Sequence, residues 1–132
     1  MFQGIGSVVI VVEDLEQGIE RYETIFGRGP DSRGGPADGS YRNAIFRFSD
    51  SVVELISPGG DEGPVARRLK TGGPGVYMMV MRVDDVGATV NELRDKGVRL
   101  LGDPGAGNEV KGQVFIHPAS TGGVLIELAS RD

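Results

Sequence analysis

Cysteine and tryptophan are absent from this sequence, histidine occurs once, and no apolar run is long. Without cysteine the chain can form no disulfide, thiolate nucleophile or cysteine-based zinc or iron–sulfur site. A single histidine excludes a multi-histidine metal site within one chain. A membrane helix needs roughly 18 consecutive apolar residues, and the first residues lack the basic and apolar regions of a signal peptide. We therefore expect a cytoplasmic protein.

An excess of positive charge is also missing. The chain carries 14 basic and 19 acidic side chains, for a net charge of −5. A surface of this sign does not attract the phosphates of nucleic acid or the headgroups of an anionic membrane. We expect neither as a partner, and a small molecule instead. The length of 132 residues suits one domain, and a hydrophobic share of 39% can form its core.

Glycine, in contrast, is frequent at 22 residues, and it separates apolar runs that repeat along the chain. In one passage a strand-like run leads through Asp14 into a helical pattern that ends at Gly27. About 70 residues later, the same sequence of features runs through Asp85 and ends at Gly97. Each aspartate stands where a helix N-cap is expected.

A second correspondence joins residues 51–57 to residues 124–130, since both are strand-like and carry one carboxylate, Glu54 and Glu127. The repeat predicts an α+β fold of two β-α-β-β-β modules that curl into a half-open barrel around one pocket. Strands are expected near residues 5–12, 41–48, 51–57, 76–83, 98–101, 113–117 and 124–128. Module one covers about residues 1–60, a bridging helix about 63–71, and module two about 74–132, all within a single domain.

The duplication pairs Glu54 with Glu127, and Ser7 with Met78 on the first strand of each module. A carboxylate in an apolar strand needs a partner, because burying it unpaired is costly. If the two carboxylates line the pocket, one of them suits the work of a general base. In the alternative, each pairs with an arginine or lies on the wet face of its strand.

Five stretches of the chain resemble the vicinal oxygen chelate superfamily, which includes glyoxalase I, bleomycin-resistance proteins and extradiol dioxygenases. They are residues 5–15, 53–58, 97–101, 115–118 and 120–128. Within the superfamily the sequence is most similar to methylmalonyl-CoA epimerases. The resemblance implies the half-open barrel, a homodimer, and a metal site of two histidines, a Gln or Glu, and a Glu.

Those four metal positions fall on Ser7, Glu54, Met78 and Glu127, so both histidines are replaced. A thioether and a serine hydroxyl are poor ligands for the divalent ions of such enzymes. We expect no metal and no other cofactor. The sequence then favours a small-molecule-binding protein of the glyoxalase/bleomycin-resistance type with a degraded metal site. The alternative is an epimerase, isomerase or lyase acting on an acyl-CoA or carbonyl compound, with Glu127 as base and Glu54 as the second catalytic candidate.

Other polar residues are candidates for the same pocket. Tyr41, Arg42 and Tyr77 could donate to an enolate or bind substrate beside Ser7 and Met78, although ordinary strand surface is the alternative. The resemblance also places Asp38 at an acidic position before the third strand.

Two further features have simpler interpretations. We expect His117, in a Phe-Ile-His-Pro run, to be structural and held by backbone near a turn. Three basic residues of the bridging helix could meet CoA phosphates or form a solvated helix face; these are Arg67, Arg68 and Lys70.

Overall fold

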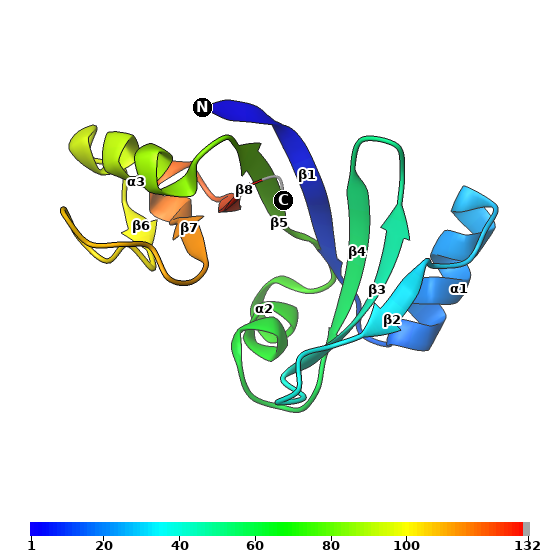
Figure 1. Ribbon diagram of the computed structural model, residues 1–132. Coiled ribbons are helices and arrows are strands. Elements are labelled where there is room, and N and C mark those ends of the chain that lie inside the picture. The colour runs from blue at the N-terminus through cyan, green and yellow to red at the C-terminus, as the bar shows by residue number, and fades with distance from the viewer. Residues whose placement is uncertain (131–132) are drawn as a thin grey trace. The chain divides into compact units, whose positions relative to one another are not determined.

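The computed structural model describes residues 1–130 and interleaves strands with helices, which confirms the expected α+β class (Figure 1). It divides into two compact units. The Glu54 unit comprises Ser7–Tyr77, and the Glu127 unit comprises Met1–Gly6 together with Met78–Asp132. None of the helices in the described part of the chain is long and apolar enough to cross a membrane.

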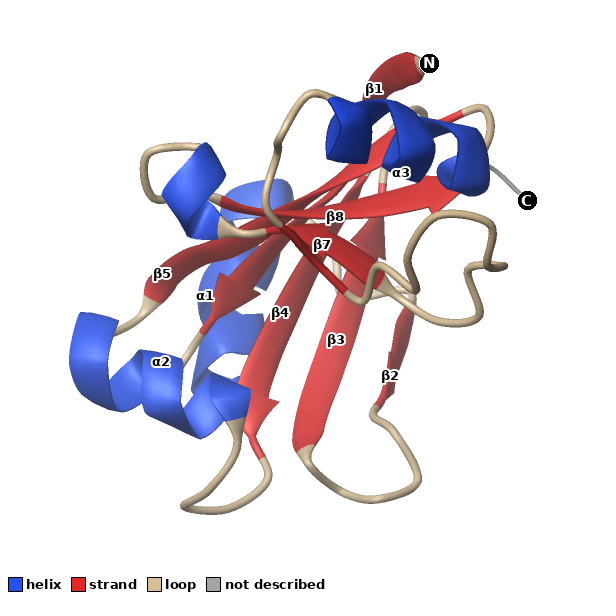
Figure 2. Cartoon of the chain, turned by 90° about the vertical axis from the view of Figure 1, so that its left-hand side faces the viewer, coloured by secondary structure: helices blue, strands red, loops and turns tan. Residues whose placement is uncertain are grey.

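The Glu54 unit has the strand order β2-β3-β4-β1. Strands β1 and β4 run parallel, whereas β3 is antiparallel to both β2 and β4. Figure 2 shows β3 and β4 side by side, with the short β2 next to β3. The elements are β1 (Phe2–Val11, entering this unit at Ser7), α1 (Leu15–Phe26), β2 (Ser32–Gly34), β3 (Tyr41–Arg47), β4 (Val52–Pro58) and α2 (Pro64–Gly72).

The Glu127 unit repeats this arrangement with the strand order β5-β8-β7-β6. Here β5 and β8 run parallel, and β7 is antiparallel to both β8 and β6. The elements are β5 (Gly75–Val83, entering this unit at Met78), α3 (Val86–Asp95), β6 (Leu100–Leu101), β7 (Val114–Ile116), a 3-10 turn (Pro118–Ser120) and β8 (Leu125–Ser130).

The predicted helix caps are confirmed in both repeats. The side chain of Asp14 accepts the N–H of Gln17 at 2.9 Å, and that of Asp85 accepts the N–H of Ala88 at 2.9 Å. Each bond satisfies one of the N–H groups that the first turn of a helix leaves without a partner. Gly27 ends α1 at a φ of 78°, in the left-handed region that glycine tolerates best.

Each unit packs one helix against one face of its strands. In the Glu54 unit, α1 covers a core of six buried side chains, namely Val12, Leu15, Ile19, Ala44, Phe46 and Leu55. In the Glu127 unit, Val90 of α3 packs in a second core with Val83, Val114, Ile116 and Leu128. Because side chains alternate along a strand, Glu54 and Glu127 lie on the faces turned away from these helices.

One strand was not predicted, and one strand begins earlier than predicted. Strand β2 was not expected, because all three of its residues are exposed and carry no apolar alternation. Strand β1 begins at Phe2 rather than near residue 5. Its start is held within the Glu127 unit, where the N–H of Asp84 donates to the carbonyl of Met1 at 3.1 Å and the terminal ammonium pairs with the Asp84 carboxylate.

Candidate functional site

Glu54 stands in the middle of β4 and is half-buried. In the parallel pair of β1 and β4, Ser7 lies opposite Val52 and Val9 opposite Glu54. Ser7 and Glu54 therefore share one face of the sheet, two positions apart in register. The carboxylate accepts a hydrogen bond from the side-chain amide of Asn43, with Nδ2 3.0 Å from Oε2.

Glu127 has the corresponding position in β8. Met78 lies opposite Leu125 and Val80 opposite Glu127, so Met78 and Glu127 share a face in the same register. The side-chain amide of Gln113 donates to this carboxylate, with Nε2 3.4 Å from Oε2. The residues that the repeat makes equivalent, Ser7 with Met78 and Glu54 with Glu127, thus have matching strand positions, each within its own unit.

A hollow of about 770 Å³ opens in the Glu127 unit between the start of α3 and the loop before β7. Its volume is in the range of small-molecule sites. Its polar lining includes Asn91, Arg94, Asn108, Lys111, Gln113 and Glu127. Glu127 therefore borders space that a ligand could occupy.

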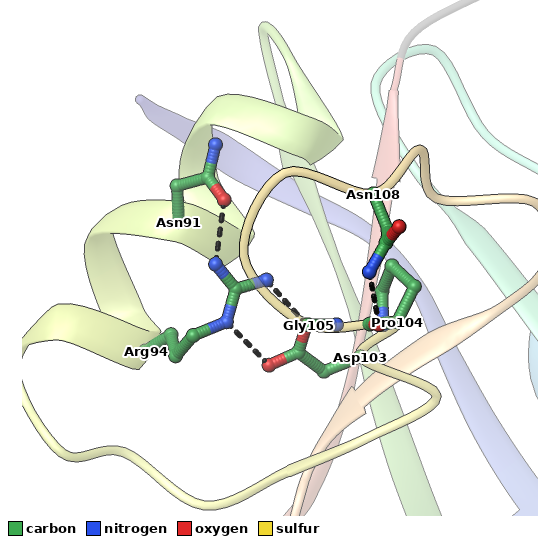
Figure 3. Close-up of polar contacts among 6 residues, drawn as sticks. All are labelled: Asn91, Arg94, Asp103, Pro104, Gly105 and Asn108. Carbon is green, nitrogen blue, oxygen red and sulfur yellow. Dashed lines mark hydrogen bonds and ion pairs between the residues drawn. The ribbon is translucent and has the colours of Figure 1, made fainter.

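One wall of this hollow is fixed by a network around Arg94 on α3 (Figure 3). Its Nε donates to Asp103 at 2.8 Å, a second nitrogen forms an ion pair with the same carboxylate, and Nη1 donates to Asn91 at 2.7 Å. Asp103 also accepts the N–H of Gly105 at 2.9 Å. The Arg94 hydrogen bonds, followed by that of Gly105, lower the pKa of Asp103 from 3.8 to about 2. The carboxylate stays charged and ties the loop to α3.

The candidate donors of the Glu54 unit fall on different faces. Arg42 belongs to the face that α1 covers, where its guanidinium approaches Glu16 of that helix at 3.9 Å. Tyr41, one residue earlier, shares the face of Glu54 by alternation along β3. Tyr77 stacks near the guanidinium of Arg68, which lies 5.9 Å from the ring centroid.

Three other candidates have local partners. Asp38 accepts the backbone N–H of Ser40 at 2.9 Å, and this bond lowers the pKa of its carboxyl group. Lys70 donates to the carbonyl of Asp61 at 2.9 Å. The Nδ1 of His117 accepts the N–H of Ala119 at 2.9 Å, which confirms the predicted structural role. Arg67 borders a separate shallow hollow with Lys70.

The residues at the four positions that the resemblance assigns to a metal do not fit a divalent ion. Each unit offers one carboxylate beside a hydroxyl or a thioether, which are weak ligands for such ions. Each carboxylate already accepts an amide hydrogen bond. Among residues 1–130, no three His, Cys, Asp or Glu side chains are grouped so that they could hold a metal.

Asn43 and Gln113 were not predicted as site residues from the sequence, because a single amide in a strand belongs to no motif. The signal was available in the repeat. Asn43-Ala44-Ile45-Phe46 and Gln113-Val114-Phe115-Ile116 occupy equivalent places, and each begins with an amide before alternating buried residues.

Comparison with known proteins agrees with this geometry. Residues 7–115 match the family described as glyoxalase/bleomycin resistance protein/dioxygenase superfamily. The mitochondrial methylmalonyl-CoA epimerase of Dictyostelium discoideum is 29% identical over 97% of this chain and 80% of its own length.

Solved structures are similar over nearly the whole chain. The methylmalonyl-CoA epimerase of Mycobacterium tuberculosis superposes with a TM-score of 0.84 at 32% identity, covering 99% of this chain and 89% of that one. A methylmalonyl-CoA epimerase in complex with methylmalonyl-CoA and NH4+ gives a TM-score of 0.83 at 29% identity, with coverage of 98% and 95%. The chain therefore belongs to the glyoxalase/bleomycin resistance protein/dioxygenase superfamily.

Proposed function

We propose that this protein is an epimerase-type enzyme that moves a proton at the carbon next to the carbonyl of an acyl-CoA compound, with Glu127 as the base. The observation that carries the proposal is the likeness to methylmalonyl-CoA epimerases over almost the entire chain, one of them in complex with methylmalonyl-CoA. These comparisons support the epimerase alternative better than the binding-protein interpretation that the replaced histidines favoured.

The proposed proton transfer requires a correctly placed base and hydrogen-bond donors. Removal of the proton between two carbonyl groups breaks the C–H bond and leaves its electron pair in an enolate. Glu127 takes the proton from one face of the carbon. A second acid, the role proposed for Glu54, delivers a proton to the opposite face of the planar carbon and inverts the centre. Glu127 is half-buried in β8, on the strand face that is turned away from α3.

The negative charge that develops on the thioester oxygen needs hydrogen-bond donors. The family implies a metal ion for this role, but the residues present do not fit one, so no step is assigned to it. Tyr41 and Tyr77 remain proposed donors or substrate-binding residues. Arg42 is a weaker candidate, because its guanidinium lies near Glu16 on the face that α1 covers.

Hydrogen–deuterium exchange at the α-carbon of methylmalonyl-CoA tests the proposal. The assay compares the wild type with Glu127→Gln in D₂O and follows the loss of the α-proton by NMR. Glu92→Gln is the matched control, since Glu92 lies on α3 and pairs with Lys96 at 2.9 Å. Loss of a general base lowers a rate by about 10²- to 10⁴-fold. We expect this loss in Glu127→Gln alone, and the same substitution at Glu54 measures the second carboxylate. Exchange by the wild type no faster than by Glu127→Gln would refute the proposal.

A second candidate is a binding protein that holds a small molecule without reaction. The observation that favours it is the replacement of both family histidines by Ser7 and Met78. Calorimetric titration with methylmalonyl-CoA separates the two functions. Saturable binding without α-carbon exchange supports the second candidate, and exchange with turnover supports the first.

A further inference from the structure

Glu54 and Glu127, each within its own unit, share the same kind of partner. Each accepts a hydrogen bond from a primary amide on the antiparallel neighbouring strand: Asn43 of β3 donates to Glu54, and Gln113 before β7 donates to Glu127. The donor–acceptor distances are 3.0 Å and 3.4 Å. The arrangement therefore occurs twice, once in each unit.

The register of the two pairs is also the same. Glu54 lies opposite Ile45, and Asn43 stands two residues before Ile45. Glu127 lies opposite Phe115, and Gln113 stands two residues before Phe115. Such diagonal neighbours lie on the same face of the sheet. Their backbones are roughly 7–8 Å apart, a distance that two extended polar side chains can bridge. The recurrence in both units argues against a chance contact.

An amide partner differs from a charged one in its effect on the carboxylate. The backbone groups of a central strand are used in the sheet, so a half-buried carboxylate there needs a side-chain donor. Arginine or lysine would supply one but would also neutralise the charge. A carboxamide fixes one oxygen through a neutral N–H group and itself adds no positive charge.

We propose that Asn43 and Gln113 are positioning residues, which set the orientation of Glu54 and Glu127 by these hydrogen bonds. For Glu127 the consequence for catalysis rests on the proposed function. The pairing itself does not, and it can be measured in the absence of any activity.

The direct test is NMR of the side-chain NH₂ groups in ¹⁵N-labelled full-length protein. Glu54→Gln should displace the amide resonances of Asn43 and leave those of Gln113 in place, whereas Glu127→Gln should do the reverse. The amide of Asn108, which donates to the carbonyl of Pro104 at 3.0 Å, is the internal reference. If the resonances of either side-chain amide do not shift when its own carboxylate is substituted, the inference is overturned for that pair.

A kinetic test separates positioning from a merely structural role. Gln113→Leu should lower kcat for α-carbon exchange by about 10- to 100-fold, the loss expected from a reacting group misplaced by about 1 Å. Its KM should stay within about twofold, since the amide is proposed to act through Glu127 rather than on the substrate. Gln113→Asn, which keeps the donor, should give a kcat between those of Gln113→Leu and the wild type, and Gln17→Leu, at an exposed position of α1, should leave kcat unchanged.

The outcomes of the two tests are distinguishable. A wild type without exchange contradicts the proposed function, while the amide resonances still decide the inference. A kcat that is equal in Gln113→Leu and the wild type contradicts a positioning role for Gln113 even if the enzyme is active.

Discussion

Replacing Gly59 with alanine should destabilise the Glu54 unit far more than the same change at the next residue. A Cβ atom at Gly59 would lie 1.7 Å from the carbonyl oxygen of Gly39 and 2.9 Å from its carbon. Both atoms are backbone, and the N–H of Gly59 donates to the carbonyl of Ser40 at 3.1 Å. The loop that precedes β3 must therefore move by more than an ångström or lose this contact.

Overpacking of this kind costs about 1–3 kcal/mol, and we expect the upper end because no flexible side chain can yield. For a chain of this size about 3 kcal/mol corresponds to a fall of roughly 10 °C in melting temperature. Gly60→Ala is the matched control, since a Cβ there meets nothing within 4 Å. Its free energy of unfolding should change by less than about 0.5 kcal/mol.

Urea denaturation and calorimetry of the two variants give the required free energies. The same loop contains Asp38 and leads into Tyr41, so Gly59→Ala should also weaken any ligand binding that depends on them. If the free energy of unfolding of Gly59→Ala lies within about 0.5 kcal/mol of that of Gly60→Ala, the loop does not pack against Gly59 as described.

Three further predictions concern one ion pair, the core of the Glu54 unit and one helix cap. Arg94 lowers the pKa of Asp103 to about 2, so the contribution of this carboxylate to stability is full above about pH 5 and is lost as the pH falls through the folded-state pKa. The difference in melting temperature between the wild type and Asp103→Asn should therefore shrink as the pH is lowered. A difference that stays constant down to about pH 2 would contradict the pairing. Phe46 is fully buried, so Phe46→Ala should cost about 3–5 kcal/mol in urea unfolding, whereas Ile25→Ala, at a residue 64% exposed, should cost less than about 0.5 kcal/mol. Asp85→Ala removes the N-cap of α3 and should cost about 1 kcal/mol, and a loss no larger than that of Ile25→Ala would argue against the cap.

Much of the fold follows from local signals in the sequence. The acidic caps Asp14 and Asp85 and the glycine stop at Gly27 have specific chemical roles at helix ends, and the structure confirms them. The apolar strand patterns gave β3, β4, β5 and β8 to within a few residues. Strand β2 could not be predicted, because three exposed residues without apolar alternation pair only through their backbone.

The site was predictable to a smaller extent. The repeat alone placed Glu54 and Glu127 at equivalent strand positions, and the register of each parallel pair agrees. The amides of Asn43 and Gln113 depend on diagonal contacts between strands, and the spacing along the chain does not reveal those contacts. The engagement of Arg42 with Glu16 likewise depends on which face α1 covers, which becomes evident only in three dimensions.

The central claim is proton transfer by a carboxylate without a divalent metal ion, and α-carbon exchange after exhaustive treatment with a chelator tests it most directly. The wild type should exchange deuterium into methylmalonyl-CoA at the same rate before and after EDTA dialysis, and Glu127→Gln should be at least about 100-fold slower in both states. Loss of exchange on dialysis, with recovery on addition of Co²⁺ or Mn²⁺, would contradict the account.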